Sequence, residues 1–344
     1  ARIRRLAGTR RVGHAGTLDP MATGVLVVGV EKATRLLGHL TLTEKEYQAT
    51  IRLGQATDTG DAEGAVLTSD TGLTPGTPAQ PAARLTRAQV EAAAAALTGE
   101  IQQVPPAVSA IKVAGRRAYQ LAREGAPPVL PPRPVTVWSF TIQALRPAPG
   151  DLLDVDVEVR CSSGTYIRAL ARDLGAALGT GGHLTALRRT AVGPYDLAQA
   201  HTLQELEDQK RQNLDLERTG ATAAPQLPAH PAPTLGGAPA PSATATASPA
   251  ADPAASAAAP VGPAAASVPW ITPLAEAAAA AFPRLDLTAE DAHRLAQGAR
   301  LPLPSDDWPE PGIPVAAFDP DSALVALVTA ESGSLRSLAV FSAP

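Results

Sequence analysis

Residues 13–24 read Gly13-His14-Ala15-Gly16-Thr17-Leu18-Asp19-Pro20-Met21-Ala22-Thr23-Gly24 and hold one carboxylate inside a loop that is punctuated by glycine. Glycine permits positive φ and close backbone approach, and Pro20 stiffens the exit from the loop. Asp19 is therefore expected to be held by a loop, and such loops commonly carry function. The alternative is that Asp19 only forms a turn, because aspartate before proline in a glycine-rich segment is a frequent turn former.

Two segments that follow this loop have the pattern of half-buried strands. Residues 46–53 alternate apolar side chains, beginning with Tyr47, with polar ones. Residues 153–159 repeat this alternation with leucine and valine against aspartate and glutamate. A period of two residues is typical of a strand with one face buried.

Two further segments between and after these strands have helical signals. Thr86 and Gln89 form a capping-box signature before the alanine run 92–96, and Gly99 is expected to end that helix. After Gly164, apolar residues recur at helical spacing, with Arg168 and Arg172 one turn apart beside them. Strands and helices are thus mixed within one domain, which predicts the α+β class.

The length and composition of the chain predict two domains joined by a linker. The chain has 344 residues, which exceeds the usual size of one domain. Residues 219–268 consist of Ala, Pro, Ser, Thr and Gly with almost no charge, which predicts a disordered linker. We expect one domain over 1–210 and a smaller one over 269–344. The ranges with predicted regular structure in the smaller domain are 275–281 and 288–297 for helices, and 315–318 and 323–329 for strands; 68–83 is predicted as a surface loop.

Several classes of protein are disfavoured by what the sequence lacks. Cys161 is the single cysteine and the six histidines are scattered, so neither an intrachain disulfide nor a metal site is expected. The sequence has no phosphate-binding Walker loop and no G-x-G-x-x-G fingerprint, so no cofactor is expected. Without a long apolar run or a signal peptide, the protein is expected to be cytoplasmic and not bound to a membrane.

The charges of the chain are unevenly placed, although the formal net charge is only −4. Residues 1–18 contain five arginines and no acidic residue, and residues 111–123 contain Lys112 and three arginines without an acidic residue. Such local basic patches are expected to contact phosphates of a nucleic acid. The alternative for either run is a solvated helix face.

Four segments, in the right order, resemble the TruB family of tRNA pseudouridine synthases. The matching segments are residues 13–20 with the G-H-x-G-x-L-D-P motif, 45–61, 103–119, and 161–168 followed by 183–189. Val108 stands where the family usually has tyrosine. Residues 269–344 resemble, more loosely, the small PUA-like barrel that ends many bacterial members. The resemblance therefore implies a mixed-sheet catalytic domain with a small carboxy-terminal PUA-like β domain.

The resemblance also implies a reaction and a partner. Members isomerise the uridine at position 55 in the T loop of tRNA: the N1–C1′ bond breaks, the uracil turns while it stays bound, and C5 joins C1′. No cofactor or metal takes part. The implied partner is the T stem-loop of tRNA, read mainly by its shape and backbone, and we expect the protein to act as a monomer.

The residue roles that the resemblance implies begin with Asp19 as the catalytic carboxylate, acting either as nucleophile or as base. Arg168 is its implied ion-pair partner, and Tyr47 stacks on the flipped base. The implied substrate-binding residues are His14, which engages the RNA, Tyr166 and Leu187, which line the uracil pocket, and Lys112 and Arg188. Judged from the residues alone, Tyr47 is equally a candidate for a core aromatic and Arg168 for a surface salt bridge.

The sequence departs from the family at its start. Ala1 falls within an expected helix, and the K-P-x-G-x-T-S signature and the strand that normally opens the family are absent. We therefore expect an edge of the catalytic sheet to be missing, as in a fragment or a chain with a misassigned start. This expectation keeps a second function class open, a non-catalytic RNA-binding or tRNA-folding module. A hydrolase using Asp19 is disfavoured, because no second carboxylate or histidine has a clear partner role nearby.

Overall fold

The fold was obtained as a computed structural model that describes residues 1–67, 81–109, 111–113, 115–126, 128–219, 271–304, 308–310 and 312–342. The predicted linker and most of the predicted loop 68–83 lie outside these residues. Ala1–Leu203 and Thr272–Pro344 form one compact unit, and Gln204–Ile271 belong to a second. Each is described by itself.

The helical segments occur along the whole described chain. In order they are α1 (Arg2–Ala7), the 3₁₀ turn η1 (Glu31–Arg35), α2 (Leu37–Leu40), the 3₁₀ turn η2 (Ala82–Arg84), α4 (Arg87–Ala95), α5 (Ala118–Arg123), α6 (Ile167–Ala177), α7 (Leu203–Thr219), α8 (Leu274–Ala281) and α9 (Ala289–Ala296). The strands are β1 (Val12–Ala15), β2 (Thr23–Gly24), β3 (Val27–Val30), β4 (Lys45–Leu53), β5 (Gly99–Gln103), β6 (Lys112–Val113), β7 (Arg116–Arg117), β8 (Arg133–Ala148), β9 (Leu152–Cys161), β10 (Gly182–Val192), β11 (Tyr195–Asp196), β12 (Arg284–Asp286), β13 (Leu301–Pro302), β14 (Val315–Phe318), β15 (Leu324–Glu331) and β16 (Ser334–Val340). This mixture confirms the predicted α+β class.

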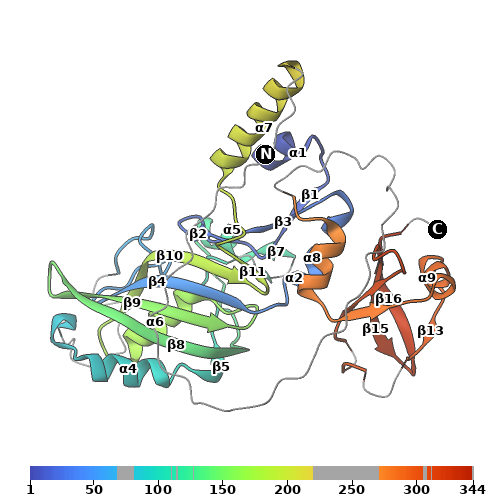
Figure 1. Cartoon of the computed structure of the whole chain (residues 1–344). Helices are drawn as coiled ribbons and strands as arrows, with labels where there is room; N and C mark the ends of the chain where they lie inside the picture. The colour runs from blue at the N-terminus through green and yellow to red at the C-terminus, as the bar shows by residue number, and fades with distance from the viewer. Residues whose placement is uncertain are drawn as a thin grey trace, which may run out of the picture. The chain divides into compact units, whose positions relative to one another are not determined.

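A seven-stranded sheet forms the body of the amino-terminal region (Figure 1). Its strand order is β11-β10-β4-β9-β8-β5, and the short β2 pairs with β10. The neighbours along the main order are antiparallel, whereas β2 runs parallel to β10. Strand β4 lies at the centre, so residues that point from it and from β10 to the same side become close neighbours.

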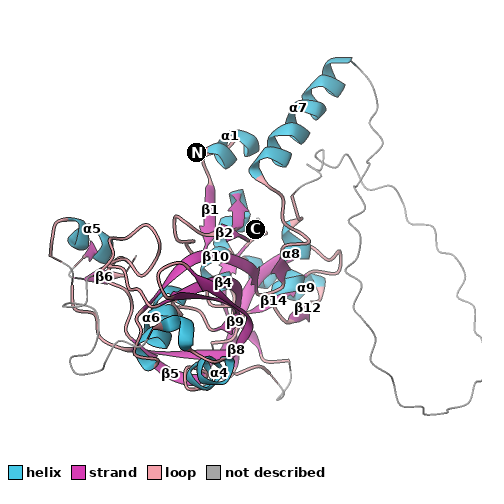
Figure 2. Ribbon diagram, turned by 90° about the vertical axis from the view of Figure 1, so that its left-hand side faces the viewer, coloured by secondary structure: helices cyan, strands magenta, loops and turns pink. Residues whose placement is uncertain are grey.

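One face of this sheet is covered by α4 and α6, and Figure 2 shows the strands from β10 to β5 curving around α6. Alternate residues of β4 and β9 point into this core, as the periodicity predicts, and Ile51 and Val155 are fully buried there. From α6, Leu170 and Leu174 are fully buried in the same core. Burying apolar side chains on both elements stabilises the sheet and fixes the position of α6 on it.

The helix predicted after Thr86 is present, but its end differs from the prediction. Thr86 and Gln89 make both hydrogen bonds of the capping box of α4. Gly99 does not end the helix: α4 stops at Ala95, and Gly99, with φ of 96°, begins β5. A glycine with positive φ can follow the end of a helix or precede a strand. The sequence alone therefore does not tell which of these two positions Gly99 occupies.

A second, five-stranded sheet is formed by the carboxy-terminal residues, in the order β12-β14-β15-β16-β13. The predicted helices correspond to α8 and α9, and the predicted strands to β14 and β15. Residues of this sheet, including Phe318 and Leu327, share an apolar cluster with Ala15 of β1 and Leu36. The strand that leads to the Asp19 loop is therefore packed on the carboxy-terminal residues. Within the described residues, no helix is both long and apolar enough to span a membrane.

Candidate active site

The Asp19 loop leaves β1 and returns to the sheet through β2. The Asp19 carbonyl accepts a hydrogen bond from the N–H of Ala22 at 2.9 Å, which closes a turn around Pro20. Met21 and Ala22 pack against the main core. The backbone of Asp19 thus forms the turn that the alternative interpretation predicts. The turn does not use the Asp19 carboxylate, which is left to make other contacts.

Gly24 is a position where glycine is required. Its φ is 96°, and a Cβ at this position would lie 2.1 Å from the carbonyl oxygen of Arg189. The chain therefore approaches β10 more closely than a side chain would allow. This close approach lets β2 pair with β10 and fixes one end of the Asp19 loop.

The Asp19 carboxylate faces the guanidinium of Arg168, which lies in the first turn of α6. Arg168 donates from Nε to Oδ2 at 2.8 Å and from Nη2 to Oδ1 at 2.7 Å. Its side chain is only 5% exposed, so this is not the surface salt bridge of the alternative interpretation. A bidentate pair of this kind restricts the orientation of the carboxylate.

The remaining donors of Arg168 bind two other segments of the chain. Nη1 donates to the carbonyl of Thr59 at 2.9 Å, and Nη2 also donates to the carbonyl of Val108 at 3.0 Å. Because the contact uses the backbone of Val108, it does not depend on the tyrosine that the family usually has there. Arg168 thus joins the Asp19 loop, the segment after β4 and the segment after β5.

A second carboxylate, which the sequence analysis missed, lies beside the same guanidinium. Asp61 is 5% exposed at its side chain and its Oδ2 is 3.7 Å from Nη1 of Arg168. Its Oδ1 accepts hydrogen bonds from the Thr59 hydroxyl at 2.6 Å and from the N–H of Glu63 at 3.1 Å. Asp61 is the last residue of the matching segment 45–61. Its place in that segment was the feature of the sequence that could have indicated it as a site residue.

Tyr47 of β4 is 8% exposed and belongs to the main core, so its packing is that of a core aromatic. Burial raises the pKa of Tyr47 to about 12, the Arg189 guanidinium acts against this rise, and the Asp19 carboxylate adds to it. The phenol is neutral near pH 7, and the Asp19 carboxylate lies close enough to affect its pKa.

Adjacent arginines of β10 point to opposite faces of the sheet. Arg188, which the resemblance indicates as substrate-binding, is exposed. Arg189 is 1% exposed and is the register partner of Tyr47. Arg189 is not among the predicted site residues. The alternation along β10 was the available signal, because it places Arg189 on the same face as the buried Leu187.

Tyr166 and Leu187, the predicted pocket residues, flank the core. Leu187 is 6% exposed and pairs in register with Ala49 of β4. Tyr166 precedes α6, and burial raises the pKa of its phenol. The buried Gln103 side chain accepts from the N–H of Tyr166 at 2.8 Å and donates to its carbonyl at 3.2 Å, which holds this position.

His14 and Lys112 are exposed, on β1 and β6. In the part of the chain that the structure describes, neither makes a hydrogen bond or ion pair with Asp19 or Arg168. Arg172, predicted beside Arg168, instead pairs with Asp173 and donates to the carbonyl of Val104 at 2.9 Å. The described residues contain no group of three or more His, Cys, Asp or Glu that could hold a metal ion.

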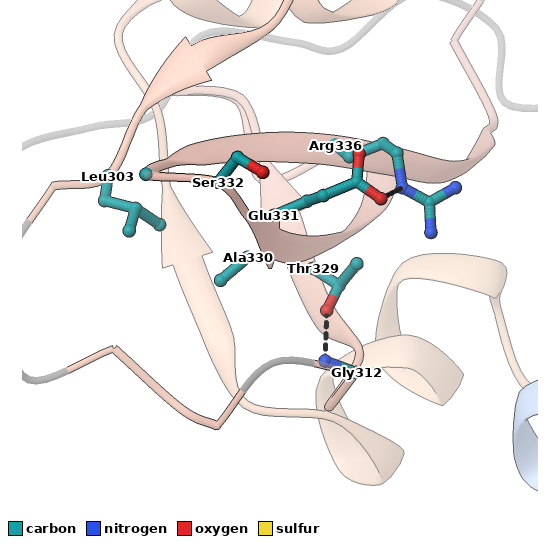
Figure 3. Close-up of a pocket in the computed structure, with 8 residues that line it drawn as sticks. Leu303, Gly312, Thr329, Ala330, Glu331, Ser332 and Arg336 are labelled. Carbon is teal, nitrogen blue, oxygen red and sulfur yellow. Dashed lines mark hydrogen bonds and ion pairs between the residues drawn. The ribbon is translucent and has the colours of Figure 1, made fainter.

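A cavity of about 520 Å³ lies in the carboxy-terminal sheet and contains none of these residues (Figure 3). Thr329 accepts a hydrogen bond from the N–H of Gly312 at its edge, and Glu331 pairs with Arg336. The charges that line it are thus neutralised within the wall.

Family models match the chain in three consecutive segments. Residues 4–167 match the amino-terminal domain of the TruB family of pseudouridylate synthases. Residues 168–221 match the carboxy-terminal domain of tRNA pseudouridylate synthase B, and residues 282–342 match the carboxy-terminal model of tRNA pseudouridine synthase II. Asp19, Tyr47 and Asp61 fall in the first segment and Arg168 opens the second.

Curated relatives cover almost the whole chain. The tRNA pseudouridine synthase B of Streptomyces griseus is 46% identical over 345 residues, covering 99% of this chain and 91% of its own length. That of Thermobifida fusca is 47% identical over 344 residues, covering 99% and 92%.

Solved structures share the fold. A structure of an H/ACA RNP bound to a substrate RNA containing 2′-deoxyuridine matches with a TM-score of 0.60 at 20% identity, covering 99% of this chain and 79% of that one. An archaeal box H/ACA Nop10–Cbf5 complex matches with the same TM-score at 21% identity, covering 99% and 80%. They support a mixed catalytic domain followed by a small carboxy-terminal β domain.

With its family models matched in order and relatives aligned over 99% of its length, the chain belongs to the TruB family of pseudouridine synthases, which are isomerases.

Proposed function

We propose that this protein converts a uridine in the T loop of tRNA, at position 55, to pseudouridine. The observation that carries the proposal is the bidentate contact of Arg168 with Asp19, at 2.8 and 2.7 Å, in a chain that belongs to this family. The relatives that match over 99% of the chain are named tRNA pseudouridine synthase B. Because the pair is only partly accessible, it favours chemistry at a base that has left the RNA stack.

The proposed reaction needs Asp19 in its ionised form. Attack on C1′ of the ribose and removal of the proton at C2′ both use a carboxylate, and two hydrogen bonds from Arg168 hold the Asp19 carboxylate in one orientation. The N1–C1′ bond breaks, a C5–C1′ bond forms, C5 loses its proton and N1 takes one up. Atoms therefore balance without a co-reactant.

We assign the neighbouring residues to the base. Tyr47 is proposed to stack on the flipped uracil, and Tyr166 and Leu187 to line its pocket. Tyr166 directly precedes α6, which carries Arg168. Tyr47 lies on β4, which packs against α6, and Leu187 lies on β10, which pairs with β4. The Tyr47 phenol is neutral near pH 7, and burial, which raises its pKa to about 12, disfavours its ionisation further. A neutral ring can face the uracil without adding a second negative charge beside Asp19.

The RNA backbone is proposed to contact the exposed basic residues. Lys112 and Arg117 lie opposite each other in the β6–β7 ribbon, and α5 continues from it to Arg123. His14 and Arg188 are proposed to add contacts nearer the site. Phosphate contacts of this kind predict binding that weakens as salt rises.

The test is tritium release from a T-loop hairpin that carries 5-³H-uridine, because loss of the C5 hydrogen marks the isomerisation. Asp19→Asn is compared with the parent and with Asp286→Asn, which changes an exposed carboxylate paired with Arg284 in β12. We expect release by the parent and by Asp286→Asn, and a loss on the order of 10⁴-fold in Asp19→Asn. If the parent binds the hairpin but releases no tritium, the proposal is wrong and a non-catalytic RNA-binding module takes its place.

A further inference from the structure

Arg189 is the largest fully buried side chain among the described residues, at 1% exposure. Burying a guanidinium is costly unless its donors are satisfied, and a carboxylate partner is the usual solution. No ion pair joins Arg189 to a carboxylate in the part of the chain that the structure describes. Two of its donors instead go to backbone carbonyls, and the identity of those carbonyls indicates its role.

The two carbonyls lie on either side of Asp19. Arg189 donates from Nε to the carbonyl of Val25 at 2.8 Å and from Nη2 to the carbonyl of Gly16 at 3.2 Å. The planar guanidinium reaches both because its donors diverge in a fixed fork. One side chain thus ties the two ends of the Asp19 loop, residues 16–25, to β10.

The backbone of Arg189 holds the same loop. Its carbonyl accepts a hydrogen bond from the N–H of Val25 at 2.8 Å, and Arg189 pairs in register with Gly24. A Cβ on Gly24 would collide with this backbone, so the approach is as close as the chain permits. Main chain and side chain of one residue therefore fasten the segment that carries the carboxylate.

The guanidinium of Arg189 also faces Tyr47 and Lys45 on β4. It opposes the rise that burial causes in the pKa of Tyr47, which places it beside the phenol. Burial lowers the pKa of Lys45 to about 8, and Arg189 adds to this. Lys45 itself donates to the carbonyls of Thr41 and Thr43, at 2.9 and 2.7 Å. Its ammonium is therefore used outside the Asp19 loop, and the contacts with that loop are made by Arg189.

We propose that Arg189 is a positioning residue that sets the Asp19 loop relative to Tyr47 by holding the Gly16 and Val25 carbonyls together. The inference rests on the proposed function for its effect on rate, whereas its effect on the loop is independent of activity. Because Arg189 is buried, its loss acts on turnover and leaves RNA affinity unchanged. A misplacement of about 1 Å costs on the order of 100-fold in rate.

The experiment compares Arg189→Met and Arg189→Lys with the parent, and uses Arg52→Met as the matched control. Arg52 lies on the same sheet but pairs with Asp154 at 2.7 Å and touches no part of the loop. Single-turnover tritium release and hairpin affinity are measured, together with amide hydrogen exchange of residues 16–25 and 45–53. For Arg189→Met we expect roughly 100-fold slower turnover, unchanged hairpin affinity, and faster exchange confined to 16–25.

The Arg189→Lys variant keeps the positive charge but lacks the diverging donors of the guanidinium, so it tests the two separately. A single ammonium cannot hold two carbonyls in the same geometry, so we expect turnover and loop exchange close to those of Arg189→Met. Full recovery in Arg189→Lys, or recovery of Arg189→Met at higher pH, would assign Arg189 to the ionisation of Tyr47 and overturn the proposal. Equal acceleration of exchange in both segments would also overturn it, as would unchanged exchange in 16–25. If the parent is inactive, the proposed function fails, while the exchange data still decide the role of Arg189 in the loop.

Discussion

The two large sheets of this protein, of seven and five strands, are stabilised differently. Buried charged groups lie in or beside the seven-stranded sheet: Lys45 and Arg189 on its strands, Asp61 in the segment after β4, and Arg168 on α6. In the described carboxy-terminal residues the buried polar side chain is Thr329, and β14 and β15 are buried almost entirely through apolar residues. Apolar burial alone suffices to fold a sheet. Charges that are buried at a cost therefore mark the region where chemistry is proposed.

Replacing one arginine in each region is the largest expected contrast. Arg168→Met leaves the buried Asp61 without its cation and frees Asp19, so we expect a loss of about 3–5 kcal/mol in unfolding free energy and loss of turnover. Arg300→Met removes a pair with Glu331 whose side chains are 57% and 42% exposed. It should cost less than about 1 kcal/mol. Urea unfolding measures both, and equal losses would contradict the distinction between the sheets.

Glycines at positive φ provide the next contrast. Gly24→Ala brings a Cβ to 2.1 Å from the Arg189 carbonyl, whereas the space at Gly298 is open, with φ of 86°. We expect about 3 kcal/mol of destabilisation and inactive protein for Gly24→Ala. Gly298→Ala should cost about 1 kcal/mol through backbone strain alone. Thermal unfolding and tritium release test the pair, and an active Gly24→Ala would show that β2 can move away from β10.

Truncating an apolar side chain in the carboxy-terminal sheet separates stability from turnover. Leu335 of β16 is 1% exposed within a cluster formed by carboxy-terminal residues. Leu335→Ala is expected to cost about 2–3 kcal/mol through lost burial and a cavity. Turnover per folded molecule should not change, because no proposed site residue belongs to that cluster. A large drop in rate at full folding would show that this sheet acts on the site.

The smallest effect is a pH dependence from Lys45. Burial lowers its pKa to about 8 from 10.5, so above pH 8 the folded state binds fewer protons there than the unfolded state. Stability from this group therefore rises between about pH 8 and 10. We expect a gain of about 2 kcal/mol over this window, at roughly 1.4 kcal/mol per pKa unit, that Lys45→Met lacks. Urea unfolding at several pH values checks the slope, and an identical slope in Lys45→Met would contradict it.

Local patterns in the sequence determined much of this protein. The alternation around Tyr47, the capping box at Thr86 and the apolar spacing of α6 each depend on residues within a few positions, and each is present in the structure. The loop motif likewise singled out Asp19, and the segment after Gly164 singled out Arg168. Short-range periodicity is sufficient here because burial of one face is the main force that forms these elements.

Only the tertiary structure decided which charges meet. Asp61 and Arg168 belong to segments separated by most of the catalytic region, and Arg189 reaches the carbonyls of Gly16 and Val25 from across the sheet. Neighbouring arginines, Arg188 and Arg189, differ in exposure because strand pleating exposes one and buries the other. The cost of a buried charge depends on partners that folding brings together, and no local pattern encodes those partners.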